Sequence, residues 1–244
     1  MIIWILAALV AFFIKGLCGF ANTLVFNSIL AFGNSNINIS PVELILGYPT
    51  NAIMAWKERK SIRKNVCIPL SVLVLAGSIP GIFILKNTNV TVIKFVFGMA
   101  VVFIGCEMLL RDVFSSRLKK GKSSKIVLTV IGFISGLLCG LYGIGALLGA
   151  YLGRVSKDTK EFKANICIVF LVENTFRILL YVLTGIISLS VLKKAVVLIP
   201  FMLAGLFLGM KCSSVLNEKI IKKIVIVMLI ISGIALCIWS LAGI

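Results

Sequence analysis

The sequence predicts an all-α polytopic membrane protein, an inverted repeat of two halves that each hold a broken, re-entrant helical hairpin and three transmembrane helices. Three observations support this fold class: the composition, two long apolar stretches interrupted by glycines, and the distribution of basic residues. Of the 244 residues, 60% are hydrophobic and 14% are charged, and the mean hydropathy is +1.15. A soluble domain is typically about half apolar and about one quarter charged, and it could not bury this much apolar surface. Soluble enzymes, nucleic-acid-binding modules and secreted disulfide scaffolds are therefore disfavoured.

The counts of charged residues, histidine and cysteine exclude further classes of protein and site. The formal charge of +17 comes from 25 Lys and Arg against 8 Asp and Glu, and in a membrane protein such an excess is typical of cytoplasmic loops. Histidine is absent, which excludes catalytic and metal sites that require imidazole. The seven cysteines lie mostly in apolar runs without a Cys-x-x-Cys pair, which favours packing residues over a disulfide framework. No cofactor, metal or nucleic-acid partner is expected.

Eight apolar stretches run along the chain, and most have the length of about 20 residues that one membrane-spanning helix needs. Two stretches, 2–32 and 126–153, are too long for one crossing and too short for two, and glycine-rich patches interrupt them at 14–22 and 135–145. Irregular backbone at membrane depth must be buried in protein or line a watery cavity, so each stretch is either one kinked helix or a re-entrant hairpin. The stretches are 2–32, 41–56, 66–85, 90–110, 126–153, 164–183, 191–210 and 220–242.

The basic residues distinguish these two possibilities for the second broken stretch. If both stretches cross the membrane once, 13 of the Lys and Arg residues in loops lie on the cytoplasmic side and 10 on the outer side. If 126–153 is re-entrant, 19 lie inside and 4 outside, which the positive-inside rule strongly prefers. Charge does not decide the first stretch, but its similarity to the second favours the same shape. We therefore expect two hairpins and six full spans, with both termini outside.

The two halves also resemble each other in sequence. Residues 12–20 read FFIKGLCGF, and residues 133–141, which begin 121 positions later, read FISGLLCGL. Matches at a nearly constant offset divide the chain into a first transmembrane repeat (1–111), a basic cytoplasmic linker (112–124) and a second transmembrane repeat (125–244). Inverted repeats with broken helices are a recurring plan of secondary transporters, in which the binding site lies near the midplane.

These features resemble the TauE/SafE family of sulfite and sulfonate exporter-like membrane proteins. The resemblance rests on the repeated glycine-rich broken helix and on the Ala-Gly-x-x-x-Gly segments at 76–81 and 204–209, and it is best at GFISGLLCGLYGIG (132–145). Residues 20–22 depart from it, since the family commonly has glycines there. The resemblance implies transport of small anions, often sulfite, sulfoacetate or related organosulfur compounds. It also implies a location in the inner or plasma membrane of a bacterium or archaeon.

The candidate binding residues gather at the broken stretches and at the polar residues within the apolar runs. Half-helix N-termini near 19–22 and 140–145 would offer free backbone N–H groups to an anion. Lys15 and Arg177 add full positive charges, and charged residues inside a membrane are costly and usually functional. Lys15 could instead extend its ammonium to the membrane surface, with its aliphatic stem along the apolar helix. The full candidate set is Lys15, Gly16, Cys18, Gly19, Asn22, Asn51, Gly136, Cys139, Gly140, Tyr142, Gly143, Gly145, Glu173, Asn174 and Arg177.

Several of these candidates have two interpretations. Glu173 and Arg177 are spaced to pair on one helix face, either as a structural pair or as an anion contact or proton-coupled switch. Asn51 and the matching Asn174 could bind substrate or hold helices together. The matched Cys18 and Cys139 could contact substrate sulfur or could simply be small packing residues. Glu43 is expected to be structural, near a helix start.

The expected function is secondary transport, as an exporter of a small anion that works by alternating access. The alternatives are a passive anion channel, uptake rather than export of a sulfur oxyanion such as thiosulfate, and a membrane subunit that transports nothing. An intramembrane enzyme is disfavoured because no catalytic constellation stands out. The expected partners are the small anionic substrate and the lipid bilayer, with anionic lipids at the basic cytoplasmic loops.

Overall fold

The computed structural model describes residues 1–30, 36–87, 125–142 and 145–215 without gaps, and scattered residues between 95 and 110 and between 223 and 241. Within these residues all regular elements are helical, as the sequence predicts. A single 3-10 turn, η1, spans Arg59–Ser61. The α-helices are α1 (Ile2–Cys18), α2 (Asn22–Leu30), α3 (Asn36–Lys57), α4 (Lys64–Asn87), α6 (Lys125–Tyr142), α7 (Ala146–Val155), α8 (Thr159–Leu183) and α9 (Leu189–Ser213).

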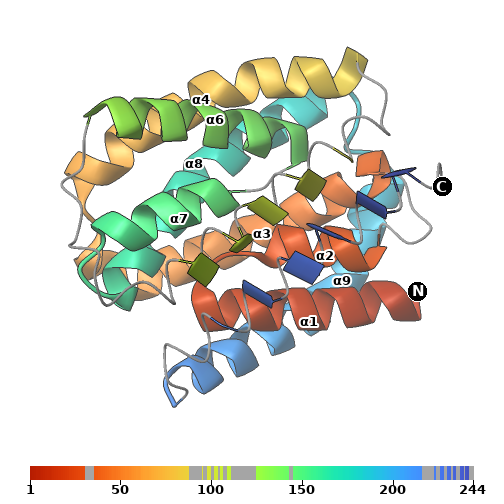
Figure 1. The fold of residues 1–244 in the computed structure, drawn as a ribbon. Coiled ribbons are helices and arrows are strands. Elements are labelled where there is room, and N and C mark those ends of the chain that lie inside the picture. The colour runs from red at the N-terminus through yellow and green to blue at the C-terminus, as the bar shows by residue number, and fades with distance from the viewer. Residues whose placement is uncertain are drawn as a thin grey trace.

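Both long apolar stretches are broken within their glycine-rich patches. Helix α1 ends because Gly19 adopts a left-handed conformation with φ of 92°, which glycine tolerates without steric cost. Ala21 follows with φ of 73°, and α2 then runs back along α1 (Figure 1). In the second stretch α6 ends at Tyr142, and α7 starts after Gly145 and runs back in the same way. Each stretch is therefore a pair of helices and not one kinked helix.

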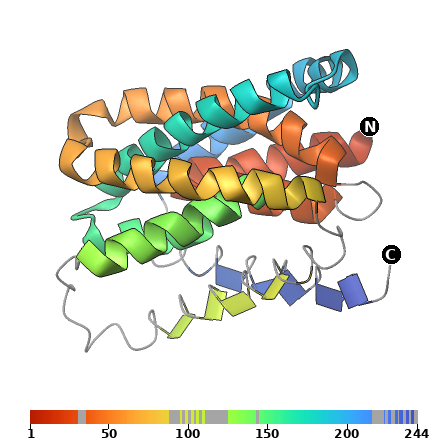
Figure 2. The ribbon, with the colours of Figure 1, turned by 90° about the horizontal axis from the view of Figure 1, so that it is seen from above.

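Two close pairs of parallel helices flank the molecule: α1 lies along α9, and α4 lies along α6 (Figures 1 and 2). Glycines permit the contact, since a Cβ added at Gly16 would lie 2.9 Å from the backbone carbon of Gly209. Likewise, a Cβ at Gly136 would lie 2.9 Å from the Cα of Gly77. The Ala-Gly-x-x-x-Gly segments thus bring helix backbones together, as small residues do in membrane helix pairs.

Basic turns gather at one end of the helices. Arg63, just before α4, pairs with Glu161 in the first turn of α8 at 3.0 Å. The Lys163 ammonium donates to the Ser213 hydroxyl at the end of α9, at 2.7 Å. The N-terminus and the turn between α8 and α9 lie at the opposite end (Figure 1). The linker at 112–124 lies outside the described residues.

The outer surface suits lipid contact. By length and composition, three helical segments among the described residues could cross a membrane: Lys64–Gly81, Thr159–Leu183 and Leu189–Ser213. Ile2–Cys18 and Leu128–Gly140 are shorter apolar helices. Large apolar side chains on these segments are exposed, so they offer the surface that a bilayer would cover. Most of the expected stretches 90–110 and 220–242 lies outside the described residues.

Candidate functional site

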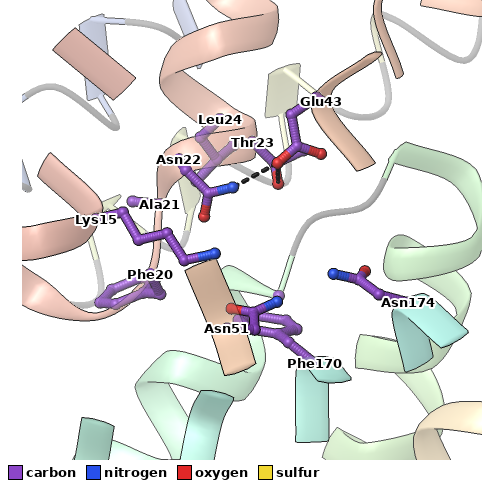
Figure 3. Close-up of a pocket in the computed structure, with 11 residues that line it drawn as sticks. Lys15, Phe20, Ala21, Asn22, Thr23, Leu24, Glu43, Asn51, Phe170 and Asn174 are labelled. Atoms are coloured by element: carbon purple, nitrogen blue, oxygen red, sulfur yellow. Dashed lines mark hydrogen bonds between the residues drawn. The ribbon is translucent and has the colours of Figure 1, made fainter. Parts of the chain in front are cut away.

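A small pocket lies where the two breaks meet α3 and α8 (Figure 3). Its free volume of about 20 Å³ suits roughly one or two water molecules. The first turn of α2 and the residue that precedes α7 both reach it, so the starts of the two returning half-helices converge on one space. The lining residues are Lys15, Phe20, Ala21, Asn22, Thr23, Leu24, Glu43, Asn51, Gly145, Phe170 and Asn174.

Lys15 places a buried cation in this pocket from the last turn of α1. Its side chain is only 1% exposed. The ammonium donates a long hydrogen bond of 3.4 Å to the Gly47 carbonyl and lies 5.9 Å from the centre of the Phe12 ring. It forms no ion pair with any carboxylate in the described part of the chain. A buried charge with such weak compensation favours an incoming anion.

Glu43 anchors the start of α2 to the middle of α3. Its Oε1 atom accepts hydrogen bonds from the Asn22 amide and, at 2.9 Å, from the Thr23 hydroxyl. Gly47 leaves room for this contact, because a Cβ there would lie 3.1 Å from the same oxygen. Because α3 begins at Asn36, Glu43 lies two turns inside the helix and lines the pocket. The expected position near a helix start is therefore wrong, while the two hydrogen bonds to the start of α2 agree with the expected structural role.

Arg177 joins three helices beside the pocket. Its Nη1 atom donates to the Cys139 carbonyl of α6 at 2.9 Å, and its Nη2 atom lies 4.0 Å from Glu43 Oε2 on α3. Its Nε atom lies 3.8 Å from Glu173 Oε1, which confirms the predicted pair one helical turn apart. Neither this Nε nor this Oε1 has a hydrogen-bond partner among the described residues.

Two asparagines extend into the pocket from facing helices, Asn51 from α3 and Asn174 from α8. The amides of both point toward the space that the Lys15 ammonium also faces (Figure 3). The buried Asn51 Oδ1 has no hydrogen-bond partner within the described residues. An unsatisfied buried amide is costly unless something occupies the space beside it. The unpaired Oδ1 can accept a hydrogen bond from a water or a protonated ligand, whereas only the side-chain NH2 groups of Asn51 and Asn174 could donate to an anion.

Some predicted site residues lie outside this pocket. Gly16, Gly136 and Gly140 pack against neighbouring helices. Gly19 packs against the Lys163 side chain, and the Cys18 thiol donates to the Ile14 carbonyl at 2.8 Å. Cys139 contributes its backbone carbonyl to Arg177. Gly143 and the Tyr142 side chain lie outside the described residues. The predicted residues that line the pocket are Lys15, Asn22, Asn51, Gly145 and Asn174.

Other lining residues were not predicted from sequence. The sequence could have indicated Glu43 as a site residue, because a single carboxylate inside an apolar stretch is as exceptional as the ammonium of Lys15. It gave no such indication for Phe20, Thr23 and Phe170, since aromatic and hydroxyl residues are common throughout the apolar runs. Phe20 lines the pocket and packs edge-on against Phe162, with ring centres 5.7 Å apart.

This arrangement suits a small anion. The N-cap residue of α7, Gly145, has no side chain to cap the first N–H groups of that helix. Helix N-termini carry partial positive charge and bind anions, and Lys15 adds a full one. Among the described residues no group of His, Cys, Asp and Glu could hold a metal ion.

Comparison with known families gives one match: the model of the family described as sulfite exporter TauE/SafE matches residues 4–236. Neither the curated proteins nor the solved structures include a match to the chain.

Proposed function

Because this match spans nearly the whole sequence, the chain belongs to the sulfite exporter TauE/SafE family, and we propose that it exports sulfite or a related organosulfur anion. The family is one of membrane transporters for sulfur compounds. The chain is accordingly a membrane protein of a transporter family rather than an enzyme family. The substrate and the direction are the proposal. The observation that carries it is the buried Lys15 ammonium, which lines the pocket and forms no ion pair with a carboxylate of the described residues.

Binding would use charge-assisted hydrogen bonds from three sides. A sulfur oxyanion has several acceptor oxygens, and the Lys15 ammonium is one donor for them. The amides of Asn51 and Asn174 and the N–H groups at the start of α7 supply further donors. Such a constellation would offer a small oxyanion hydrogen-bond donors from several sides of the pocket.

The pocket's small volume favours a carrier over an open pore. A space of about 20 Å³ holds roughly one or two waters, so a sulfite ion can enter only if the surrounding helices move. Phe20 lines the pocket and packs edge-on against the Phe162 ring. Alternating access, in which the hairpins open first to one side and then to the other, provides such a movement.

We further propose that residues 1–111 and 125–244 form an inverted repeat around the 112–124 linker. In such a repeat α1 corresponds to α6, α3 to α8 and α4 to α9. The contact between α1 and α9 then corresponds to the contact between α6 and α4. The contact between α3 and α8 corresponds to itself, and all three contacts are present. In Figure 1, α1 and α6 run in opposite directions. This pattern of contacts supports two halves of opposite orientation, as in other secondary transporters.

The orientation in the membrane follows from the basic end of the molecule. We place this end, which carries η1 and the start of α8, in the cytoplasm of a bacterium or archaeon, with both termini outside. Arg59 lies 4.9 Å from the Trp56 ring, and Trp56 is 72% exposed. Tryptophan at an interface next to basic residues suits the headgroups of anionic lipids.

Counterflow of radiolabelled sulfite in proteoliposomes tests the function. Purified protein should give uptake that saturates with sulfite and that is accelerated by unlabelled sulfite on the opposite side. Conductive flux without saturation would indicate a channel, and flux equal to that of empty liposomes would contradict transport. Competition by thiosulfate, sulfate, sulfoacetate and taurine would then rank the substrates. The direction of transport follows from sulfite accumulation in cells with and without the protein.

A further inference from the structure

We propose that Glu173 takes up one proton when the anion binds, so that a monoanion and a proton cross the membrane together. This inference rests on the proposed transport function and adds its coupling ion. It is drawn from the charges and hydrogen bonds of the four buried ionisable groups around the pocket.

The four groups balance each other before substrate binds. Lys15 and Arg177 are each 1% exposed, and Glu43 and Glu173 are each 2% exposed. With both carboxylates ionised, the two positive and two negative charges sum to zero, although within the described residues neither carboxylate forms an ion pair with Lys15. A bound monoanion would add one negative charge far from water, and an uncompensated buried charge is strongly unfavourable. Protonation of one carboxylate restores the balance.

Hydrogen bonding indicates which carboxylate takes the proton. Glu43 accepts two hydrogen bonds, from Asn22 and Thr23, and its second oxygen faces Arg177. Hydrogen bonds to the charged form of a carboxyl group favour that form. By contrast, Glu173 Oε1 has no hydrogen-bond donor in the described structure. The ionised form of Glu173 is therefore the less stabilised of the two.

The surroundings of Glu173 support the same assignment. Arg177 lies on its own helix, with 3.8 Å between Nε and Oε1, and this contact is too long for a hydrogen bond. Through Arg177, Glu43 on α3 and Cys139 on α6 lie close to Glu173, since Arg177 lies 4.0 Å from Glu43 Oε2 and donates to the Cys139 carbonyl at 2.9 Å. A second carboxylate nearby disfavours the ionised form of Glu173 through like-charge repulsion. After protonation, Arg177 keeps its 2.9 Å hydrogen bond to the Cys139 carbonyl and its 4.0 Å contact with Glu43 Oε2, which is also too long for a hydrogen bond.

Glu173 is also placed to respond to substrate. The next residue, Asn174, lines the pocket, so anion binding and proton binding involve one turn of α8. The proton enters from the solvent on the side where the anion binds and leaves with the anion on the other side. One negative and one positive charge then move together, and no net charge crosses the membrane.

The test measures how an imposed membrane potential changes the equilibrium distribution of sulfite across proteoliposomes. Valinomycin and a potassium gradient set the potential at about 100 mV with equal pH on both sides. Wild-type protein should give the same distribution with and without the potential. Glu173→Gln is permanently neutral, so sulfite should move as a lone monoanion and its distribution should shift about 50-fold. Glu161→Gln, at the basic end of the helices, should behave as wild type.

Sulfite counterflow is measured on the same vesicles, because exchange of one anion for another needs no release of the proton. Glu173→Gln should retain it. The inference is overturned if the wild-type distribution follows the potential, if Glu173→Gln stays insensitive to it, or if folded Glu173→Gln loses counterflow. If the variant does not fold, the wild-type measurement alone decides. Absence of counterflow in wild type would instead refute the proposed transport function.

Discussion

Replacing Lys15 by methionine should weaken anion binding without unfolding the protein. Methionine is unbranched and nearly as long, so it keeps the packing around the buried stem while removing the charge. The lost interaction with the anion is a hydrogen bond to a charged group, which contributes about 1.5–3 kcal/mol. Since about 1.4 kcal/mol corresponds to a tenfold change in Kd, sulfite should bind about 10- to 150-fold more weakly.

Stability without sulfite should change little in Lys15→Met, because among the described residues the ammonium makes one long hydrogen bond, of 3.4 Å to the Gly47 carbonyl, and a 5.9 Å contact with the Phe12 ring. Isothermal titration of sulfite into the purified protein measures the affinity, and thermal unfolding measures the stability. Lys160→Met is the matched control, since Lys160 is exposed in the first turn of α8. Affinity of Lys15→Met within twofold of wild type, or an equal loss in Lys160→Met, would refute the assignment.

Three further changes test the packing and the site boundary. Gly209→Ala should lower the Tm of the purified protein by several degrees, because its Cβ would lie 2.9 Å from backbone of α1; Gly153→Ala, with open space around it, should not. Asp158→Ala removes the side chain that caps α8 and should cost about 1 kcal/mol, seen as a Tm decrease of about 2–4 °C. The double variant Cys18→Ser/Cys139→Ser should transport sulfite at close to the wild-type rate, since neither side chain lines the pocket. An unchanged Tm for Gly209→Ala or for Asp158→Ala, or a large loss of transport for the double cysteine variant, would contradict these expectations.

The sequence predicted the elements that position the site because each left a mark on local composition. The glycine-rich patches located both breaks, and the left-handed Gly19 shows why a glycine ends α1. Lys15 and Asn174 could be identified because a charged or strongly polar side chain is exceptional within an apolar stretch. The i, i+4 spacing of Glu173 and Arg177 was enough to predict their pairing.

The partners across the bundle could not be predicted in the same way. Gly16 and Gly136 have the same local signature as a glycine that admits a ligand, and only the tertiary fold shows that α9 and α4 lie against them. The role of Glu43 depends on α3 starting at Asn36 and on α2 folding back toward it. Contacts of this kind join residues far apart in the chain, so local composition does not encode them.

The most direct test of the central claim is an experimental structure of the protein with sulfite bound. One sulfite ion should lie between the starts of α2 and α7, with an oxygen within hydrogen-bond distance of the Lys15 ammonium and others near the amides of Asn51 and Asn174. Sulfite found only at the basic end of the helices, around Arg59 and Lys60, with the pocket unchanged, would contradict the account.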